Sequence, residues 1–400
     1  MAHSSRALSF AALALAAFSQ IACGTGFDPG SELKSLRVLG VQKSIPYPQP
    51  GDDVTLSMLW HDGRSAQEGQ PVPGRLDNSN PSQRNVQVMW FPPCLNPAGD
   101  LYQTCFADPR LFLSEGVPPL TDRAAYMRDR FTFQVPAGDK VFQGREPLPG
   151  QPKYGLFYVF FALCAGTLEL QSDSPLPRCV LDTGESLEPD ADGLGGSKEF
   201  VIGYSTVYVF ATKDGQEFSN ENPTFAAPKF RIGGREYEPD CMDPLPAELP
   251  AGSTLSSCIT PEGGQLPLPN LSDDEPCDED RVACVKPCEA DGEPGDCPAI
   301  SIGPALDRDV VEREKDTVSA AYFNRPNFNE QMWINYYTDH GGLKSEVRLL
   351  NDATEGFNPK YRTDFYAPKA GPSTLWAVVH DNRGGQAFMR KTILVKPDAP

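Results

Sequence analysis

YGLFYVFFALCAG, residues 154–166, is an apolar run of strand length that ends at a turn containing Gly, and STLWAVVHDNRGG, residues 373–385, repeats this pattern. An alternating strand that ends in a turn with Pro and Gly precedes each run, and one further strand follows it. The preceding strands are FTFQVPAG (131–138) and TDFYAPKAG (363–371), and the following strands are FVIGYSTVYVF (200–210) and FMRKTILVK (388–396). The same succession of strands therefore occurs twice in the chain.

A strand that carries a Trp stands before each of these successions. VQVMWF (86–91) contains Trp90, and NEQMWINYY (329–337) contains Trp333. A Trp-bearing strand, a strand ending at a Gly turn and a more apolar strand are typical of the middle and end of an immunoglobulin-like sandwich. No Cys precedes Trp90 at the distance seen in antibody domains, so the likeness is to immunoglobulin-like sandwiches in the loose sense.

The composition also favours an all-β protein. Pro (40) and Gly (35) make up nearly a fifth of the 400 residues, as in chains of short strands joined by turns. We predict two tandem immunoglobulin-like β-sandwiches with a disulfide-rich, loop-like insertion. The predicted parts are a signal peptide at 1–22, a tether at 23–33, a first sandwich at 34–213 and a second sandwich at 214–400, interrupted by an acidic Cys-rich insertion at 240–297.

The N-terminus has the features of an export signal. Arg6 precedes the apolar block at 7–18, which is too short to span a bilayer. Ala22 stands before Cys23 as in a bacterial lipobox, although Gln20 replaces the usual Leu. Setting Cys23 aside leaves ten of the eleven cysteines for pairing. We predict lipidation at Cys23 and a cell-envelope location, with a periplasmic or secreted protein as the alternative.

The insertion is acidic and rich in cysteine. It holds fourteen Asp and Glu against Arg281 and Lys286, with few aliphatic residues, so disulfides have to organise it. A zinc site is disfavoured, because the insertion contains no His and an oxidising compartment would pair the thiols first. Its six cysteines are Cys241, Cys258, Cys277, Cys284, Cys288 and Cys297, and the spacing does not choose among their possible pairings. We predict that the insertion is a contact surface.

The first half of the chain has two cysteine pairs of its own. Cys94 and Cys105 flank a loop after the Trp90 strand, and Cys164 and Cys179 flank a loop after the apolar strand. We predict a disulfide across each loop.

EPDADGLGGSKE, residues 188–199, is the best candidate for a metal site. Its spacing resembles an EF-hand loop, and Asp190, Asp192 and Glu199 would be the oxygen ligands of Ca²⁺. The loop begins with Glu, contains Pro, and precedes a strand instead of a helix. A solvated acidic loop is therefore the preferred interpretation, and no other cofactor is predicted.

Catalytic motifs are scarce. After the signal only His61, His340 and His380 remain, each beside Asp or Gly where a strand meets a turn, and no metalloprotease, nucleophile-elbow or phosphate-loop motif occurs. His380 and Asp381 are better explained as a turn-stabilising pair than as an acid and base. We predict no catalytic residues and a protein that is not an enzyme.

Aromatic residues gather between Tyr322 and Tyr337. Alternation along a strand places about half of them in a core, and Phe328 and Tyr337 are the two predicted to be exposed for binding. A net charge of −19 argues against a nucleic-acid partner, because phosphate binding needs clustered Lys and Arg.

With Cys23, EFVIGYSTVYVF before NENP, and the closing TLWAVVHDNRGG, the chain resembles predicted exported lipoproteins of myxobacterial type. That resemblance implies tandem immunoglobulin-like domains on a membrane anchor and supplies no catalytic residues. We expect adhesion, scaffolding or ligand binding at the outer membrane, with a protein or glycan partner. The alternative is an accessory protein or hydrolase of the envelope that acts on glycan or peptide.

Overall fold

The computed structural model describes residues 31–399 with gaps. Residues 1–30, which include the predicted signal peptide and Cys23, lie outside the described part. The further gaps are residues 64–85, 96–100, 120, 144–151, 172–175, 189–198, 213–217, 226, 250–251, 270, 273–274, 279–281, 289–296, 307, 309–319, 321–327, 368–369 and 398. No helix among the described residues is long and apolar enough to cross a membrane.

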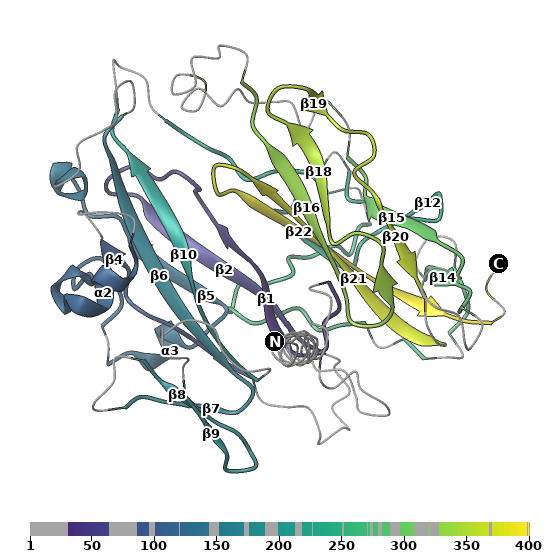
Figure 1. The fold of residues 1–400 in the computed structure, drawn as a ribbon, viewed down its shortest axis with the longest axis horizontal. Coiled ribbons are helices and arrows are strands. Elements are labelled where there is room, and N and C mark those ends of the chain that lie inside the picture. Colours follow the sequence, from purple (N-terminus) through teal and green to yellow (C-terminus); the bar gives the residue numbers. More distant parts are fainter. Residues whose placement is uncertain are drawn as a thin grey trace, which may run out of the picture. The chain divides into compact units, whose positions relative to one another are not determined.

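Two facing sheets form the first sandwich (Figure 1). One sheet has the strand order β1-β2-β5, and the other has the order β10-β6-β3 with β4 also paired to β6. This is the arrangement of an immunoglobulin-like sandwich, in which the first, second and fifth strands face the third, sixth and seventh. The strands are β1 (Leu36–Lys43), β2 (Asp53–Asp62), β3 (Gln87–Trp90), β4 (Cys94–Leu95), β5 (Arg130–Gln134), β6 (Tyr154–Cys164) and β10 (Phe200–Phe210).

Alternating side chains from both sheets fill the core of this sandwich. Val54, Leu56 and Met58 point inward from β2, and the Trp90 ring lies against Phe131 and Phe161 at centroid distances of 6.0 and 5.6 Å. In these strands apolar residues recur at every second position, and every second side chain of a strand points to the same face. The sequence pattern therefore predicts the strands.

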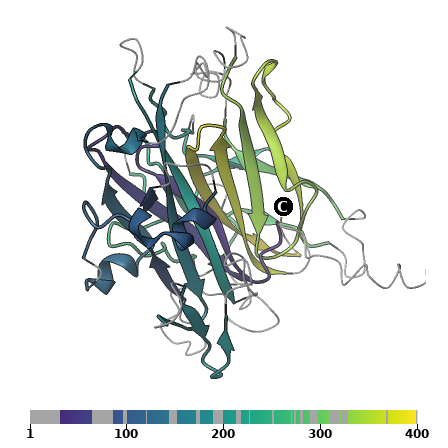
Figure 2. The ribbon, with the colours of Figure 1, turned by 60° about the vertical axis from the view of Figure 1, so that its left-hand side comes forward.

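Nearly every residue of β6 is buried, because its outer face is covered as well. A small sheet covers one part of it, and the short helix α2 covers another part (Figure 2). The covering elements are β7 (Thr167–Glu169), β8 (Arg178–Val180), β9 (Ser186–Leu187), α2 (Gln103–Ala107) and the 3₁₀ turn η2 (Pro109–Leu111). The disulfides Cys94–Cys105 and Cys164–Cys179 hold these covers in place, so both pairs predicted from the sequence form.

The second sandwich repeats the arrangement on a larger scale. One sheet has the order β12-β11-β15-β20-β17, and the other has the order β13-β22-β21-β16-β18-β19 with β14 also paired to β22. The repeated stretches of the sequence occupy equivalent positions, since β21 and β22 correspond to β6 and β10. The strands are β11 (Phe230–Ile232), β12 (Arg235–Tyr237), β13 (Cys241–Asp243), β14 (Cys284–Val285), β15 (Ile300–Pro304), β16 (Met332–Thr338), β17 (Gly342–Leu343), β18 (Val347–Asp352), β19 (Gly356–Phe357), β20 (Thr363–Tyr366), β21 (Gly371–Asp381) and β22 (Gln386–Val395).

The match between the two Trp-bearing strands is off by one residue. Trp90 points into the first core, but Met332, Ile334 and Tyr336 are the residues of β16 that point into the second. Trp333 therefore lies on the outer face of its sheet, where its ring stacks on His380 at a centroid distance of 5.3 Å. Moving a strand by one residue exchanges its two faces.

The acidic insertion is bound into the second sandwich more closely than a loop would be. Its strands β13 and β14 both pair with β22, and Met242, Ala283 and Val285 are buried in the second core. Three local bridges organise it, Cys241–Cys258, Cys277–Cys284 and Cys288–Cys297. With the two bridges of the first sandwich they use all ten cysteines other than Cys23, as is typical of proteins outside the cytoplasm.

An apolar cluster joins the two sandwiches, and we call it the inter-sandwich core. Leu39 and Leu59 from the first sandwich pack with Trp376, Val378 and Phe388 from the second. Leu33, Cys241, Cys258, Ile259 and Leu268 complete the cluster. Part of the predicted contact surface of the insertion is thus used inside the chain.

The end of the predicted tether is also fixed. Leu33 is fully buried, and its N–H donates to the carbonyl of Thr338 on β16 at 2.8 Å. A Cβ on Gly63 would lie only 1.5 Å from the Leu33 carbonyl oxygen, so the chain passes here only because position 63 is Gly. The chain from residue 31 onward therefore belongs to the folded part.

Candidate ligand pocket on the first sandwich

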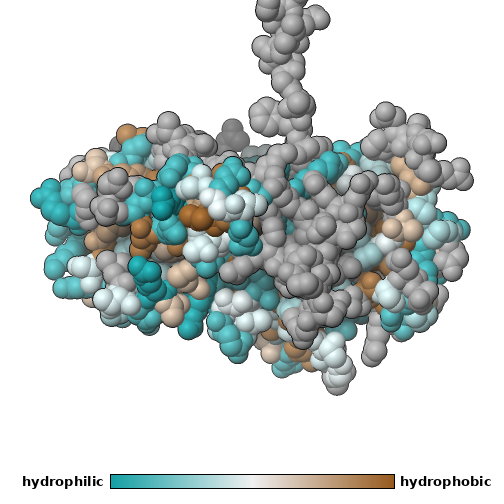
Figure 3. Space-filling view, turned by 90° about the horizontal axis from the view of Figure 1, so that it is seen from below, coloured by the Kyte–Doolittle hydropathy of each residue, from teal (hydrophilic) through white to brown (hydrophobic). Residues whose placement is uncertain are grey.

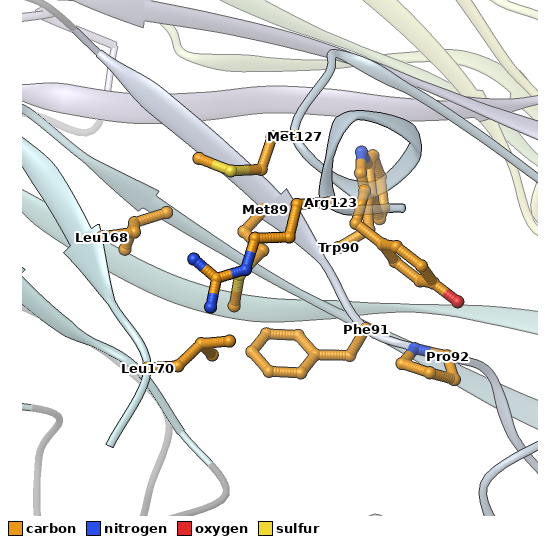
Figure 4. A pocket seen from close by; sticks show the side chains of 9 residues that line it. Met89, Trp90, Phe91, Pro92, Arg123, Met127, Leu168 and Leu170 are labelled. Carbon is orange, nitrogen blue, oxygen red and sulfur yellow. The ribbon is translucent and has the colours of Figure 1, made fainter. Parts of the chain in front are cut away.

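An apolar pocket with one positive charge lies beside β3. We call it the Arg123 pocket; its lining comes from β3 and the residues after it, from the short helix α3 (Arg123–Tyr126) and from β7 (Figure 4). The lining residues are Met89, Trp90, Phe91, Pro92, Arg123, Tyr126, Met127, Leu168 and Leu170. Three segments far apart in the sequence thus meet at one site.

Helix α3 positions the charge. The Asp122 side chain caps its N-terminus by accepting from the Ala125 N–H at 3.3 Å, and Tyr126 is buried in the first core, with its hydroxyl donating to the Pro118 carbonyl at 2.6 Å. Arg123 and Met127 stand four residues apart, which places them on the same side of a helical turn. The cap and the buried Tyr126 therefore fix the backbone from which the exposed side chains of Arg123 and Met127 extend.

The floor of the pocket is equally well held. Trp90 points inward and donates from Nε1 to the Arg128 carbonyl at 2.8 Å, so its neighbour Met89 points outward into the pocket. The Gln87 side-chain oxygen accepts from the Leu168 N–H at 2.9 Å and ties β7 to β3. Both sides of the pocket are thus anchored to strands.

The rim of the pocket is apolar and open to solvent. Met127 is 36 % exposed and Leu170 is 54 % exposed, among the few large apolar side chains with such exposure in the described chain. In the view of Figure 3, small groups of hydrophobic residues interrupt a largely hydrophilic surface. Uncovered apolar groups gathered at a pocket favour a binding role.

Arg123 gives the pocket its charge preference. Its guanidinium lies over the opening between Leu170 and Met127 (Figure 4). It forms no hydrogen bond or ion pair with any described residue, whereas Arg178 on nearby β8 pairs with Glu169 at 2.8 Å. A guanidinium without an anion beside it suits a carboxylate, which can accept two parallel hydrogen bonds.

The size of the cavity narrows the ligand class. Its volume of about 90 Å³ is well below the ~300–1,000 Å³ of pockets that enclose a drug-sized molecule. Such a cavity accepts a single apolar side chain, as the anchor of a peptide or protein partner does.

A larger hollow of about 710 Å³ lies between the 110–116 loop and the turn after β5. Its lining contains the charged residues Arg110, Glu115 and Lys140, of which Arg110 is paired with Asp108 at 2.8 Å, and loop residues provide most of the rest. The Arg123 pocket differs in combining one charge with an otherwise largely apolar lining.

The two aromatic residues predicted to be exposed are both half-buried. Tyr337 is half-buried, packs against the inter-sandwich core, and its hydroxyl accepts from the Asn335 Nδ2 at 3.3 Å. Phe328 is also half-buried. Alternation along one strand shows which side chains share a face, but it does not show that the part of the face carrying Tyr337 packs against the inter-sandwich core.

The predicted calcium loop lies largely outside the described residues. Asp190 and Asp192 fall in that gap, and Glu199 is described immediately before β10. Among the residues that the structure describes, no group of three His, Cys, Asp or Glu side chains could hold a metal ion.

His61 and His340 come together around Asp339, although they stand far apart in the sequence. Asp339 is buried and accepts from the Thr374 N–H at 2.7 Å, and its carboxylate lies 3.8 Å from Nδ1 of His340. Burial alone would raise the pKa of Asp339, but the neighbouring His340 and His61 hold that pKa below its usual value. The Ser373 hydroxyl donates to the His340 carbonyl at 2.8 Å, so it is turned away from the imidazole.

His380 and Asp381 do not orient one another. The Asp381 carboxylate accepts from the Arg383 and Gly385 N–H groups at 2.8 and 2.7 Å, and from Asn220 in the linker between the sandwiches at 3.1 Å. Burial lowers the pKa of His380 to about 4, so the imidazole is neutral near pH 7. Asp381 organises the turn, and it also holds the linker.

The Arg123 pocket was not found from the sequence. One signal was present in VQVMWF, where Met89 and Phe91 alternate with the inward-facing Val88 and Trp90. When a strand is apolar on both faces, its outer face is either covered by another part of the chain or used for binding. The sequence did not show that Arg123 would lie over that face.

Comparisons with known proteins give this chain no family. No family model and no curated protein matches it. Among solved structures it is similar to the three N-terminal domains of the bacteriophage RB49 Highly Immunogenic Outer Capsid protein (Hoc), with 9% identity and a TM-score of 0.17. That alignment covers 90% of this chain and 100% of the capsid protein chain, and at such a score it carries no functional conclusion.

Proposed function

We propose that this protein is a non-enzymatic lipoprotein of the cell envelope that acts in adhesion, scaffolding or ligand binding, and that the Arg123 pocket is its binding site. The supporting observation is a guanidinium that pairs with no described residue and lies at an open apolar pocket whose walls are anchored to β3 and to the first core. Preorganised walls reduce the entropy lost on binding. The ligand class that fits is a peptide with an apolar anchor side chain beside a carboxylate.

A lipid on Cys23 would hold this site at a membrane surface. Every other cysteine is paired, so Cys23 is the one cysteine left for such a modification. Mass spectrometry of the protein from the envelope fraction, with and without reduction, tests this part. We expect a lipid mass on Cys23; an unmodified N-terminus would indicate a periplasmic or secreted protein.

A peptide array tests the pocket. Peptides that combine Leu, Met or Phe with a nearby Asp or Glu should bind, and Arg123→Ala should weaken binding by about tenfold, as expected for the loss of one charge-assisted contact. Arg110→Ala is the matched control, because it removes an exposed Arg of the same sandwich that lies outside the pocket. Equal effects of the two variants would reject the pocket as the site.

The alternative is a hydrolase or enzyme accessory protein that acts on glycan or peptide. Asp339 and His340 are the pair from which such an activity would be built. A glycan and peptide hydrolysis screen with His340→Ala as the control distinguishes the two classes. Turnover that this substitution abolishes would favour the enzyme.

A further inference from the structure

Two sets of exposed apolar side chains in the described chain have charges of opposite sign beside them. Met127 and Leu170 surround Arg123 at the pocket, and Leu245 and Leu249, each 39 % exposed, flank Glu248 in the insertion. The pocket therefore carries a cation and the insertion carries an anion, each beside exposed apolar side chains.

The second set lies in a short segment after β13, residues 244–249, which we call the Leu245 segment. It has the sequence PLPAEL and forms neither helix nor strand. Pro244 and Pro246 fix their own φ angles, which limits the entropy that the segment loses on binding. Apolar and acidic side chains on such a segment match the ligand class of the Arg123 pocket.

The base of the Leu245 segment is firmly held. Asp243 at its start accepts from the Ser257 hydroxyl at 2.5 Å and from the Cys258 N–H at 2.8 Å, and the Cys241–Cys258 bridge closes the loop. On the far side, the Ser253 hydroxyl donates to Glu238 at 2.5 Å. The segment is therefore held at its base, and its two leucines are each partly exposed.

Charge complementarity points to a second copy of this chain as the occupant. Neither the Glu248 carboxylate nor the Arg123 guanidinium has an ion-pair partner among the described residues. At a net charge of −19 two copies repel one another over most of their surfaces, so a local cation is needed where they touch. Arg123 supplies that cation at an apolar site.

We propose that the Arg123 pocket of one copy binds the Leu245 segment of another, with a leucine in the cavity and Glu248 on the guanidinium. This inference rests on the proposed binding role of the pocket and names its partner. The pocket and the segment are different surfaces, so the contact is head-to-tail and joins copies into rings or open chains. One small contact is weak, and anchoring on a membrane would raise its occupancy by raising the local concentration.

Sedimentation velocity over a range of protein concentrations tests the proposal, with the full chain carrying Cys23→Ser so that no lipid interferes. We expect concentration-dependent association near physiological salt. Arg123→Glu and Glu248→Arg should each weaken it by about tenfold or more, since reversing one member of a charge pair turns attraction into repulsion. The double variant should regain association, and Arg110→Glu should leave it unchanged.

Three results would overturn this inference: a monomer at every concentration, association that survives Arg123→Glu, or a double variant no better than the single ones. Circular dichroism of each variant shows whether the fold is intact. The peptide array tests the pocket as a binding site independently of whether a second copy is its partner. Peptides that bind wild type but not Arg123→Ala, together with a monomeric protein, would preserve the pocket and reject the second copy as its partner.

Discussion

Asp129 is a buried carboxylate at the contact between the first sandwich and the insertion. It accepts from Trp60 Nε1 at 2.8 Å and from Gln265 Nε2 at 3.1 Å, and its N–H donates to the Gly263 carbonyl. Burial raises the pKa of Asp129 to about 6, because the charged form loses more hydration than these hydrogen bonds return. The residue holds the insertion against β2 and β5 at a cost in stability near neutral pH.

The variant Asp129→Asn tests whether the raised pKa of Asp129 makes the protein less stable as pH rises. A folded-state pKa above the unfolded value means that Asp129 supports folding fully at pH below about 4 and loses that contribution as pH rises through about 6. The melting temperature of Asp129→Asn relative to wild type should therefore rise between pH 4.5 and pH 7, by the equivalent of about 2 kcal/mol. His61 and His380, with lowered pKa values, act in the opposite direction, which is why the difference between the two proteins is measured.

Asp352→Asn is the control for this prediction. Hydrogen bonds from Thr354 and Glu355 lower the pKa of Asp352, so the melting temperature of this variant relative to wild type should fall as pH rises. The same pH trend in both variants would contradict the assignment of Asp129.

Among the elements, the long strands were predictable and the short ones were not. β6, β10, β21 and β22 carry ten or more residues of strand pattern, and local sequence alone specifies them. β13 and β14 have three and two residues, and they are strands only because β22 lies beside them. The Arg123 pocket was missed for the same reason, since it exists only once α3, β3 and β7 have packed together.

The bridges of the insertion differ in their surroundings, and this predicts different effects on stability. Cys241 and Cys258 are fully buried in the inter-sandwich core, whereas Cys288 and Cys297 are half-buried near its end. Replacing Cys241 and Cys258 by Ser should cost about 2–5 kcal/mol for the bridge, and the hydroxyls then placed in an apolar cluster add to the loss.

The Cys288→Ser and Cys297→Ser pair is the matched control. Its loop spans 9 residues against 17, so loop entropy alone predicts a difference well under 1 kcal/mol. Urea unfolding of both double variants measures the contrast. Equal losses would mean that the burial of the Cys241–Cys258 bridge is unimportant.

At the scale of the whole molecule, the contacts between the two sandwiches favour their unfolding together. The inter-sandwich core joins them through apolar contacts, and polar contacts add to this at the β21–β22 turn. Lys43 of β1 donates to the Gly384 carbonyl at 2.8 Å, and Gln386 Oε1 accepts from the Val41 N–H at 2.9 Å. The NENP and HDNRGG stretches noted in the sequence supply part of this contact, because Asn220 and Asn222 bind Asp381 and Gln386. The sequence predicted two domains and gave no sign of this coupling, which depends on residues more than 300 positions apart.

Coupling of this kind predicts a single unfolding transition. Differential scanning calorimetry of the wild type should give a ratio of calorimetric to van't Hoff enthalpy near one. Trp376→Ala should cost about 3–5 kcal/mol and separate the transition into two, because Trp376 packs on Leu39, Leu59 and His61 across the contact. Ile302→Val, which trims one methylene within the second core, should lower the melting temperature and leave a single transition. Two transitions in the wild type would mean that the sandwiches fold independently, and the contacts at Trp376 and Asp381 would then set their orientation without linking their stability.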